Sequence, residues 1–159
     1  MVGKMILAFV LACAFLSAGA APHIPASGAR VLERLPGGAS PARRDLQRLR
    51  GALDARPGDL ALATMLAQRY IEQSRRDGDP RYLGYAQAAL APWWAQPQPP
   101  AEVLVLRATL RQSTHQFGAA LTDLETVLQR DSGNAQAWLT RATVQTITGD
   151  FTGARSSCS

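Results

Sequence analysis

Histidine is the side chain most often used as an acid–base catalyst or metal ligand, and this chain of 159 residues contains two, His23 and His115. His23 has no second histidine, cysteine or carboxylate at ligand spacing, so we expect a solvated side chain. His115 lies in a predicted turn, and Asp123 is expected on the outer side of the helix that follows. The sequence also lacks a glycine-rich phosphate loop and a nucleophile elbow. We therefore expect a non-catalytic protein with no cofactor, no metal and no small-molecule substrate.

The two cysteines, Cys13 and Cys158, lie near opposite ends of the chain. The stretch VLAC that ends at Cys13 resembles a loose bacterial lipobox, so a lipid anchor at Cys13 stays open as an alternative. The apolar residues 14–16 that follow favour plain secretion instead. If cleavage follows Ala20, Cys158 is the cysteine that remains and cannot form an intramolecular disulfide. We expect Cys158 to be a small packing residue at the end of a helix.

Arginine dominates the charge of the chain, which has a formal net charge of +5 and a pI near 10.0. The basic residues are scattered among the acids, and only the stretch Arg43–Arg50 is dense. Nucleic-acid binding requires basic side chains clustered on one surface, and Asp45 interrupts this stretch. We expect a solvated helix face and no nucleic-acid partner. Binding of nucleic acid or anionic lipid through this helix is the alternative.

The N-terminus has the pattern of an export signal. Lys4 precedes an uncharged, apolar run over residues 5–20. The run has about the length of a signal h-region and is too short to span a bilayer comfortably. Small residues at Ala18 and Ala20 provide the cleavage site. We predict that residues 1–20 are a signal peptide and that the protein is exported, and is periplasmic or secreted.

The rest of the chain alternates between helical patterns and breaks. Residues 21–40 are rich in Pro, Gly, Ser and Ala, which predicts a flexible tether. Ser40 and Pro41 form a helix start, and Asp59 can cap the next helix. Large aromatics at Trp93 and Trp94 are expected to close a helix against its neighbour. The predicted helices span residues 41–55, 60–76, 82–94, 101–114 and 117–130, with two more beginning at Ala135 and Phe151. The side chains expected to enter the core from the second helix are Leu62, Met65, Leu66, Ala67, Tyr70 and Ile71.

An internal repeat relates the last helices to the pair before them. Aligning the chain with itself lays residues 101–125 over residues 135–159, and seven of the 25 aligned pairs are identical. An offset of about 34 residues is typical of a helix–turn–helix repeat. The identical pairs are Ala101/Ala135, Arg107/Arg141, Ala108/Ala142, Thr109/Thr143, Thr114/Thr148, Phe117/Phe151 and Ala120/Ala154.

These residues resemble the tetratricopeptide repeat (TPR) family, and the signal peptide suggests a bacterial exported member. Trp138, Ala142, Phe151 and Ala154 match the family's bulky, small, aromatic and small positions. The resemblance implies an all-α fold, a short α-solenoid of antiparallel helix pairs over residues 41–159. Its units are expected at about 60–100, 101–134 and 135–159, with a lone leading helix at 41–55. About seven extra residues in the first unit are assigned to a longer turn at 73–80, and the short last helix suggests an array truncated at its C-terminus.

The resemblance also implies a binding face lined by the first helix of each pair. Such a face usually binds a peptide or a helix of another protein, here expected to be a partner in the cell envelope. The family's Lys and Asn clamp for a terminal carboxylate is absent, because Val105 and Thr109 stand at two of its positions. We expect a scaffold for protein–protein interaction; an accessory domain of a longer protein is the alternative. The predicted partner-binding residues are Gln68, Glu72, Glu102, Val105, Thr109, Gln112, Gln136, Leu139, Thr143 and Thr146.

Overall fold

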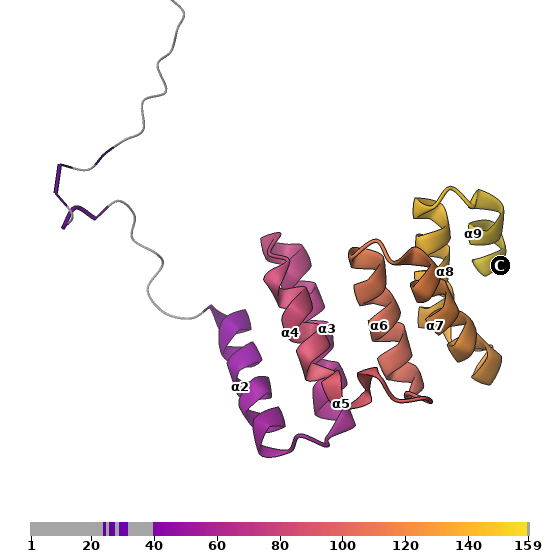
Figure 1. Cartoon of the computed structure of the whole chain (residues 1–159), viewed down its shortest axis with the longest axis horizontal. Coiled ribbons are helices and arrows are strands. Elements are labelled where there is room, and N and C mark those ends of the chain that lie inside the picture. Colours follow the sequence, from indigo (N-terminus) through magenta and orange to yellow (C-terminus); the bar gives the residue numbers. More distant parts are fainter. Residues whose placement is uncertain (1–23, 25, 28, 32–39, 159) are drawn as a thin grey trace, which may run out of the picture. The chain divides into compact units, whose positions relative to one another are not determined.

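The computed structural model describes residues 24, 26, 27, 29–31 and 40–158 of the chain (Figure 1). The chain divides into two units, Met1–Gly38 and Ala39–Ser159. The predicted signal peptide, Cys13 and His23 lie outside the described residues. The described part of the first unit contains a turn in which the N–H of Arg30 donates to the carbonyl oxygen of Ser27 at 3.0 Å.

The second unit is helical, which confirms the predicted all-α class. Helices account for 74% of the residues that the structure describes, and this part of the chain contains no strand. None of the described helices is both long and apolar enough to cross a membrane. The helices are α2 (Pro41–Ala55), α3 (Leu60–Asp77), α4 (Arg81–Ala89), α5 (Ala91–Trp94), α6 (Ala101–Ser113), α7 (Phe117–Arg130), α8 (Ala135–Ile147) and α9 (Phe151–Ser157).

Short polar side chains begin several of these helices, as their sequence predicts. The Ser40 hydroxyl accepts from the N–H of Arg43 at 3.3 Å, and Pro41 occupies the first helical position. The Asp59 carboxylate accepts from the N–H of Leu62 at 3.0 Å. Each bond satisfies an N–H that the helix itself cannot pair. The predicted starts of α2 and α3 are therefore confirmed.

Left-handed residues end three helices and allow the chain to reverse. Gly78 after α3 has φ 66°, His115 after α6 has φ 60° and Gly149 after α8 has φ 83°. His115 and Gly149 occupy equivalent positions of the internal repeat, so the same turn recurs in both pairs. A histidine in this conformation costs about 1–2 kcal/mol that glycine does not. The exposed His115 is thus a turn residue, with its ring edge-on to Phe117 at 5.5 Å between centroids.

Helix α3 ends at Asp77, one residue beyond its predicted end, and it includes most of the turn predicted at 73–80. It has 18 residues, whereas α6 and α8 have 13 each, so the residues assigned to a lengthened turn at 73–80 mostly extend the helix. Buried polar side chains stabilise this extension. The Gln73 amide donates to Asp77 at 2.6 Å, and the Ser74 hydroxyl donates to the Asp79 carbonyl at 2.9 Å. The assignment to a turn was wrong because it counted repeat length and ignored these partners.

The predicted helix at 82–94 is interrupted at Leu90. Helix α4 ends at Ala89, and the short α5 follows. Pro92 has no N–H to donate to the preceding turn, which ends the regular hydrogen-bond ladder. Trp93 and Trp94 pack half-buried against the neighbouring core, as their proposed closing role requires.

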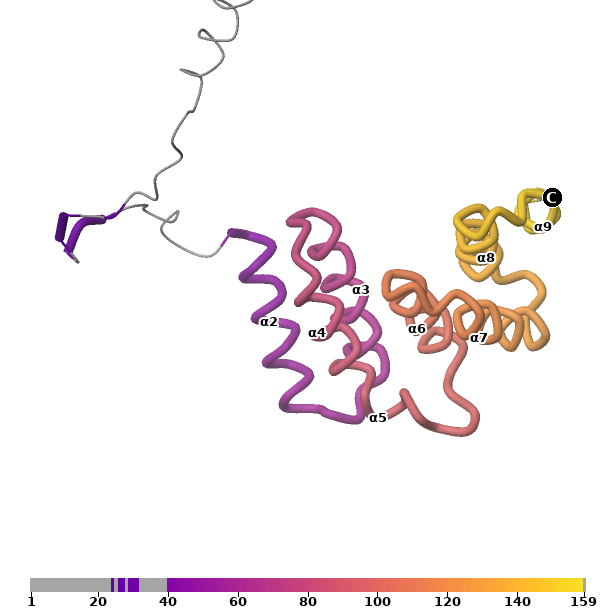
Figure 2. Tube along the Cα trace, turned by 45° about the horizontal axis from the view of Figure 1, so that its top comes forward, coloured from indigo at the N-terminus to yellow at the C-terminus, as the bar shows by residue number. Residues whose placement is uncertain are grey.

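Two clusters of buried apolar side chains hold the helices together. Helices that follow one another in the chain pack side by side, and α6 lies between the α3–α4 pair and the α7–α8 pair (Figures 1 and 2). The first cluster joins α2, α3 and α4 to Val103 and Leu110 of α6. The second joins Leu104, Val105 and Ala108 of α6 to α7 and α8. Helix α6 therefore contributes to both cores.

Small residues of the internal repeat are buried. Ala108 of α6 and Ala120 of α7 are fully buried, and Ala142 of α8 is buried. Side chains of this size let helix axes approach to about 8–10 Å. The burial of Ala108, Ala120 and Ala142 is compatible with such close packing, whereas Ala154 of α9 is only half-buried.

The burial of two side chains is the opposite of what the sequence predicts. Asp123, expected on the outer side of its helix, is buried with 3% of its surface exposed. It accepts hydrogen bonds from Arg107 and Arg111 of α6, which balance its charge. Cys158, expected to pack inside, is exposed because α9 ends at Ser157 and Cys158 is its C-cap.

Candidate binding groove

A groove of about 850 Å³ runs over the first helix of each pair, α3, α6 and α8. These helices are in contact, α3 with α6 and α6 with α8. The groove is lined from α3 by Ala61, Thr64, Met65, Gln68, Ile71, Glu72 and Arg75; from α6 by Glu102, Val105, Leu106, Thr109 and Gln112; and from α8 and its cap by Asn134, Gln136, Leu139, Thr140 and Thr143.

Nine of the ten predicted partner-binding residues line this groove. The exception is Thr146, whose hydroxyl donates to the Ala142 carbonyl at 2.8 Å on the last turn of α8. The groove ends on that helix at Thr143, one turn earlier. The first-helix pattern thus brings together residues from three separate parts of the chain, from Gln68 to Thr143.

Met65 is a groove residue that the sequence assigned to the core. Met65 is 48% exposed and lies about one turn from Ala61 and Gln68, on the face of α3 that lines the groove. The spacing of 61, 65, 68, 72 and 75 is that of one helix face and identifies Met65 and Arg75 in retrospect. Leu139 of α8, which is 59% exposed, is the second large apolar side chain that the groove presents to solvent.

The threonines of the groove present oxygen lone pairs and methyl groups. Thr64, Thr109 and Thr143 donate their hydroxyl hydrogens to carbonyls of their own helices, at 2.9, 3.0 and 2.8 Å. A hydroxyl that has donated can still accept. One threonine on each helix therefore offers an acceptor beside a methyl group, an arrangement suited to ligand N–H groups and small apolar side chains.

The glutamine side chains of the groove differ in whether they already form hydrogen bonds within the protein. Gln68 donates to Glu72 at 3.3 Å, and Gln136 donates to the Thr140 hydroxyl at 3.3 Å. The Gln112 side chain has no hydrogen-bond partner within the described part of the chain, so its amide N–H groups and its carbonyl oxygen remain available near the C-terminal end of α6.

Charge in the groove is sparse and separated. Glu72 pairs with Arg69 at 2.9 Å, which leaves it largely compensated. Glu102, at the second position of α6, and Arg75, near the end of α3, are exposed. Among the described residues neither has an ion-pair partner. The groove therefore carries one uncompensated negative and one uncompensated positive charge.

The arginines of α2 form the exposed helix face that the sequence predicts. Arg43, Arg44, Arg48 and Arg50 are exposed, and Asp45 pairs with Arg48 at 2.5 Å. A smaller cleft of about 280 Å³ lies between α2 and α3 and has charges of both signs. The described residues include no group of three or more His, Cys, Asp or Glu placed to hold a metal ion.

Comparison of the chain with protein-family models, with curated proteins and with solved structures finds no match.

Proposed function

We propose that the helical unit is a non-catalytic interaction module that binds a peptide or a helix of another protein in the groove of α3, α6 and α8. The observation that carries this proposal is the groove itself, which has a volume of about 850 Å³ and is lined by three helices from separate parts of the sequence. Its exposed apolar side chains and threonine acceptors suit the uncharged part of a protein segment.

The proposal includes a short α-solenoid of TPR-like helix pairs. Its support is that helix boundaries recur at a constant offset in the sequence. Helix α6 spans 101–113 and helix α8 spans 135–147, so the first and last residues are shifted by the same number of positions. Helices α7 and α9 begin at 117 and 151, with the same shift. Stacked pairs of this kind bury a shared core and leave the first helices to line a common face.

The partner is proposed to reside in the cell envelope, because residues 1–20 have the composition of an export signal. Intact mass of the mature protein tests this. A chain that begins at Ala21 supports secretion, and a diacylated Cys13 supports a lipid anchor. An intact Met1 in the envelope fraction would contradict both.

Site-specific photocrosslinking tests the binding face. A photoreactive amino acid at Leu139 should give a crosslinked adduct in envelope extracts, whereas one at Ile147 should not. Ile147 is a matched control, because it is 53% exposed on the same helix and does not line the groove. The crosslinked segment, made as a peptide, should bind the full chain and lose affinity for the Leu139→Glu variant. Equal crosslinking at both positions would contradict the proposal.

A further inference from the structure

We infer that the groove selects an extended protein segment with a basic side chain at one end, an acidic side chain at the other and an uncharged centre. This inference rests on the proposed function and adds the chemistry and the placement of the bound segment.

The two uncompensated charges mark opposite ends of the groove. Helices α3 and α6 run in the same direction (Figure 1), so Glu102 in the first turn of α6 and Arg75 in the last turn of α3 lie toward opposite ends. Glu72, the groove's other acid, is already engaged by Arg69 and by the Gln68 amide. A ligand that enters the groove therefore meets a carboxylate at the end where α6 begins and a guanidinium at the end where α3 finishes.

The length of the groove sets the length of the segment. Gln112 lies ten positions after Glu102 on α6, which corresponds to about 15 Å along the helix axis. An extended chain covers this distance with about five residues, at roughly 3.3 Å per residue. A bound helix would need about ten residues for the same span, at about 1.5 Å each.

The centre of the groove favours the extended form. Between its two ends the groove presents Met65 and Leu139 for apolar contact and one threonine acceptor on each helix. An extended segment still has unpaired backbone N–H groups that can donate to these hydroxyls. A helix has already used its backbone donors, apart from those of its first turn. The threonine acceptors therefore favour an extended occupant.

A charge at each end also determines placement. In the reversed orientation, the segment's basic residue would lie near Arg75 and its acidic residue near Glu102, and each would be repelled by a like charge. The two groove charges therefore favour one orientation of the segment. A segment with one favourable charge should gain roughly two- to fivefold in affinity over a neutral one, as expected for exposed ion pairs.

Peptide selection tests the inference. A phage library of random heptamers is selected on the purified full chain, and binders are kept only if Leu139→Glu abolishes their binding and Ile147→Glu does not. We expect the retained peptides to have Lys or Arg separated from Asp or Glu by about three to five uncharged residues, which is the extended length of the groove. Selection on Glu102→Gln should remove the basic preference alone, and selection on Arg75→Gln the acidic preference alone.

The controls use charges outside the groove. Arg76→Gln and Glu125→Gln change exposed residues that do not line it, and both preferences should survive. Circular dichroism confirms that every variant is folded. The inference would be overturned if the groove-dependent peptides showed no charge bias, or if Glu102→Gln and Arg75→Gln left that bias unchanged. Either result would leave the proposed function standing. Failure to recover any groove-dependent peptide would count against both.

Discussion

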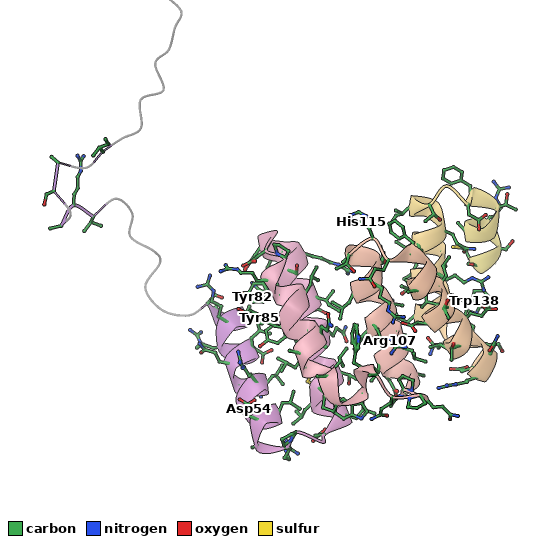
Figure 3. All side chains as sticks on the ribbon, viewed as in Figure 1. Asp54, Tyr82, Tyr85, Arg107, His115 and Trp138 are labelled. Atoms are coloured by element: carbon green, nitrogen blue, oxygen red, sulfur yellow. The ribbon has the colours of Figure 1, made fainter. Side chains whose placement is uncertain are left out.

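Asp123 of α7 accepts two hydrogen bonds from the guanidinium of Arg107, at 2.9 and 2.7 Å. Asp123 is buried, and Arg107, labelled on α6 in Figure 3, is part-buried. Arg111 donates to the same carboxylate at 2.8 Å. Arg107 also donates to the Trp94 carbonyl and lies 5.8 Å from the centroid of the Trp94 ring. Arg107 of α6 thus connects α5, through Trp94, with α7, through Asp123.

Removal of this carboxylate should strongly destabilise the domain. Asp123→Ala leaves two arginines without their buried partner, and breaking a buried pair in this way costs about 3–5 kcal/mol. Urea unfolding followed by circular dichroism measures the loss. A change below about 1 kcal/mol, the range of exposed ion pairs, would show that water replaces the carboxylate without penalty.

The matched control lies at the equivalent positions of the last helix pair. Ser157 takes the place of Asp123 and Gln145 that of Arg111, and the Ser157 hydroxyl donates to the Gln145 side chain at 2.7 Å. This neutral hydrogen bond should cost only about 1 kcal/mol on Ser157→Ala. The last pair of helices therefore has the same connection in an uncharged and weaker form.

A larger side chain at Ala120 should disrupt the contact between α6 and α7. Ala120 is fully buried against the second core cluster, so Ala120→Leu is expected to destabilise by about 1–3 kcal/mol through overpacking. Thermal unfolding measures the effect. Gln129→Leu, on the exposed side of α7, adds a similar side chain and should leave the melting temperature nearly unchanged.

Gly153 should resist substitution although it lies in a helix. A Cβ there would overlap the Asp150 carboxylate, which caps α9, and the Gln145 amide, which donates a hydrogen bond to that carboxylate. Gly153→Ala is therefore expected to destabilise. The contrasting variant is Gly118→Ala, where a Cβ meets nothing within 4 Å. Alanine lowers the conformational entropy of the unfolded chain, which should stabilise the folded domain by up to about 0.5–1 kcal/mol. The same sign for both variants would contradict this prediction.

Alkaline pH should weaken the contact between α2, α3 and α4. Burial raises the pKa of Tyr70 above its ordinary value of 10.0, although a hydrogen bond from Arg50 partly opposes the shift. Asp54 and Tyr85 also face this hydroxyl and raise its pKa. Because the folded state holds the proton more tightly, the stabilisation is complete below the unfolded pKa.

The expected result is a free energy of unfolding that falls as the pH rises from the ordinary tyrosine pKa through the raised one. Tyr70→Phe removes this titration and should flatten the pH dependence above about pH 10. Urea unfolding between about pH 9 and 11 measures both proteins. Parallel curves would show that Tyr70 does not titrate differently in the folded state.

The helix boundaries were predictable because their signals are local. Ser40, Asp59 and the repeat period each act within a few turns of chain, and the structure places helices where they indicate. Most of the groove was also predictable, since the resemblance of the repeat to the TPR family implied that first-helix residues such as Gln68 and Thr109 share one face, and these residues line the groove.

The failures came from interactions between elements. Asp123 is buried because Arg107 and Arg111 of another helix compensate its charge, which no pattern within α7 reveals. Met65 has the hydrophobicity of a core residue, yet its face of α3 turns toward the groove. Hydrophobicity indicates that a side chain prefers burial; whether a neighbour covers it depends on how the helices are placed.

The participation of α6 in both apolar clusters determines how the domain should open. Each of the other described helices contributes buried side chains to one cluster at most. Helix α6 therefore cannot be exposed without the loss of both clusters. Its amide hydrogens should exchange with solvent only through global unfolding, whereas those of the short α9 should exchange through local fraying. The second cluster includes fewer buried side chains from α8 than from α6 or α7. A segment bound across α3, α6 and α8 should therefore slow amide exchange most at α8.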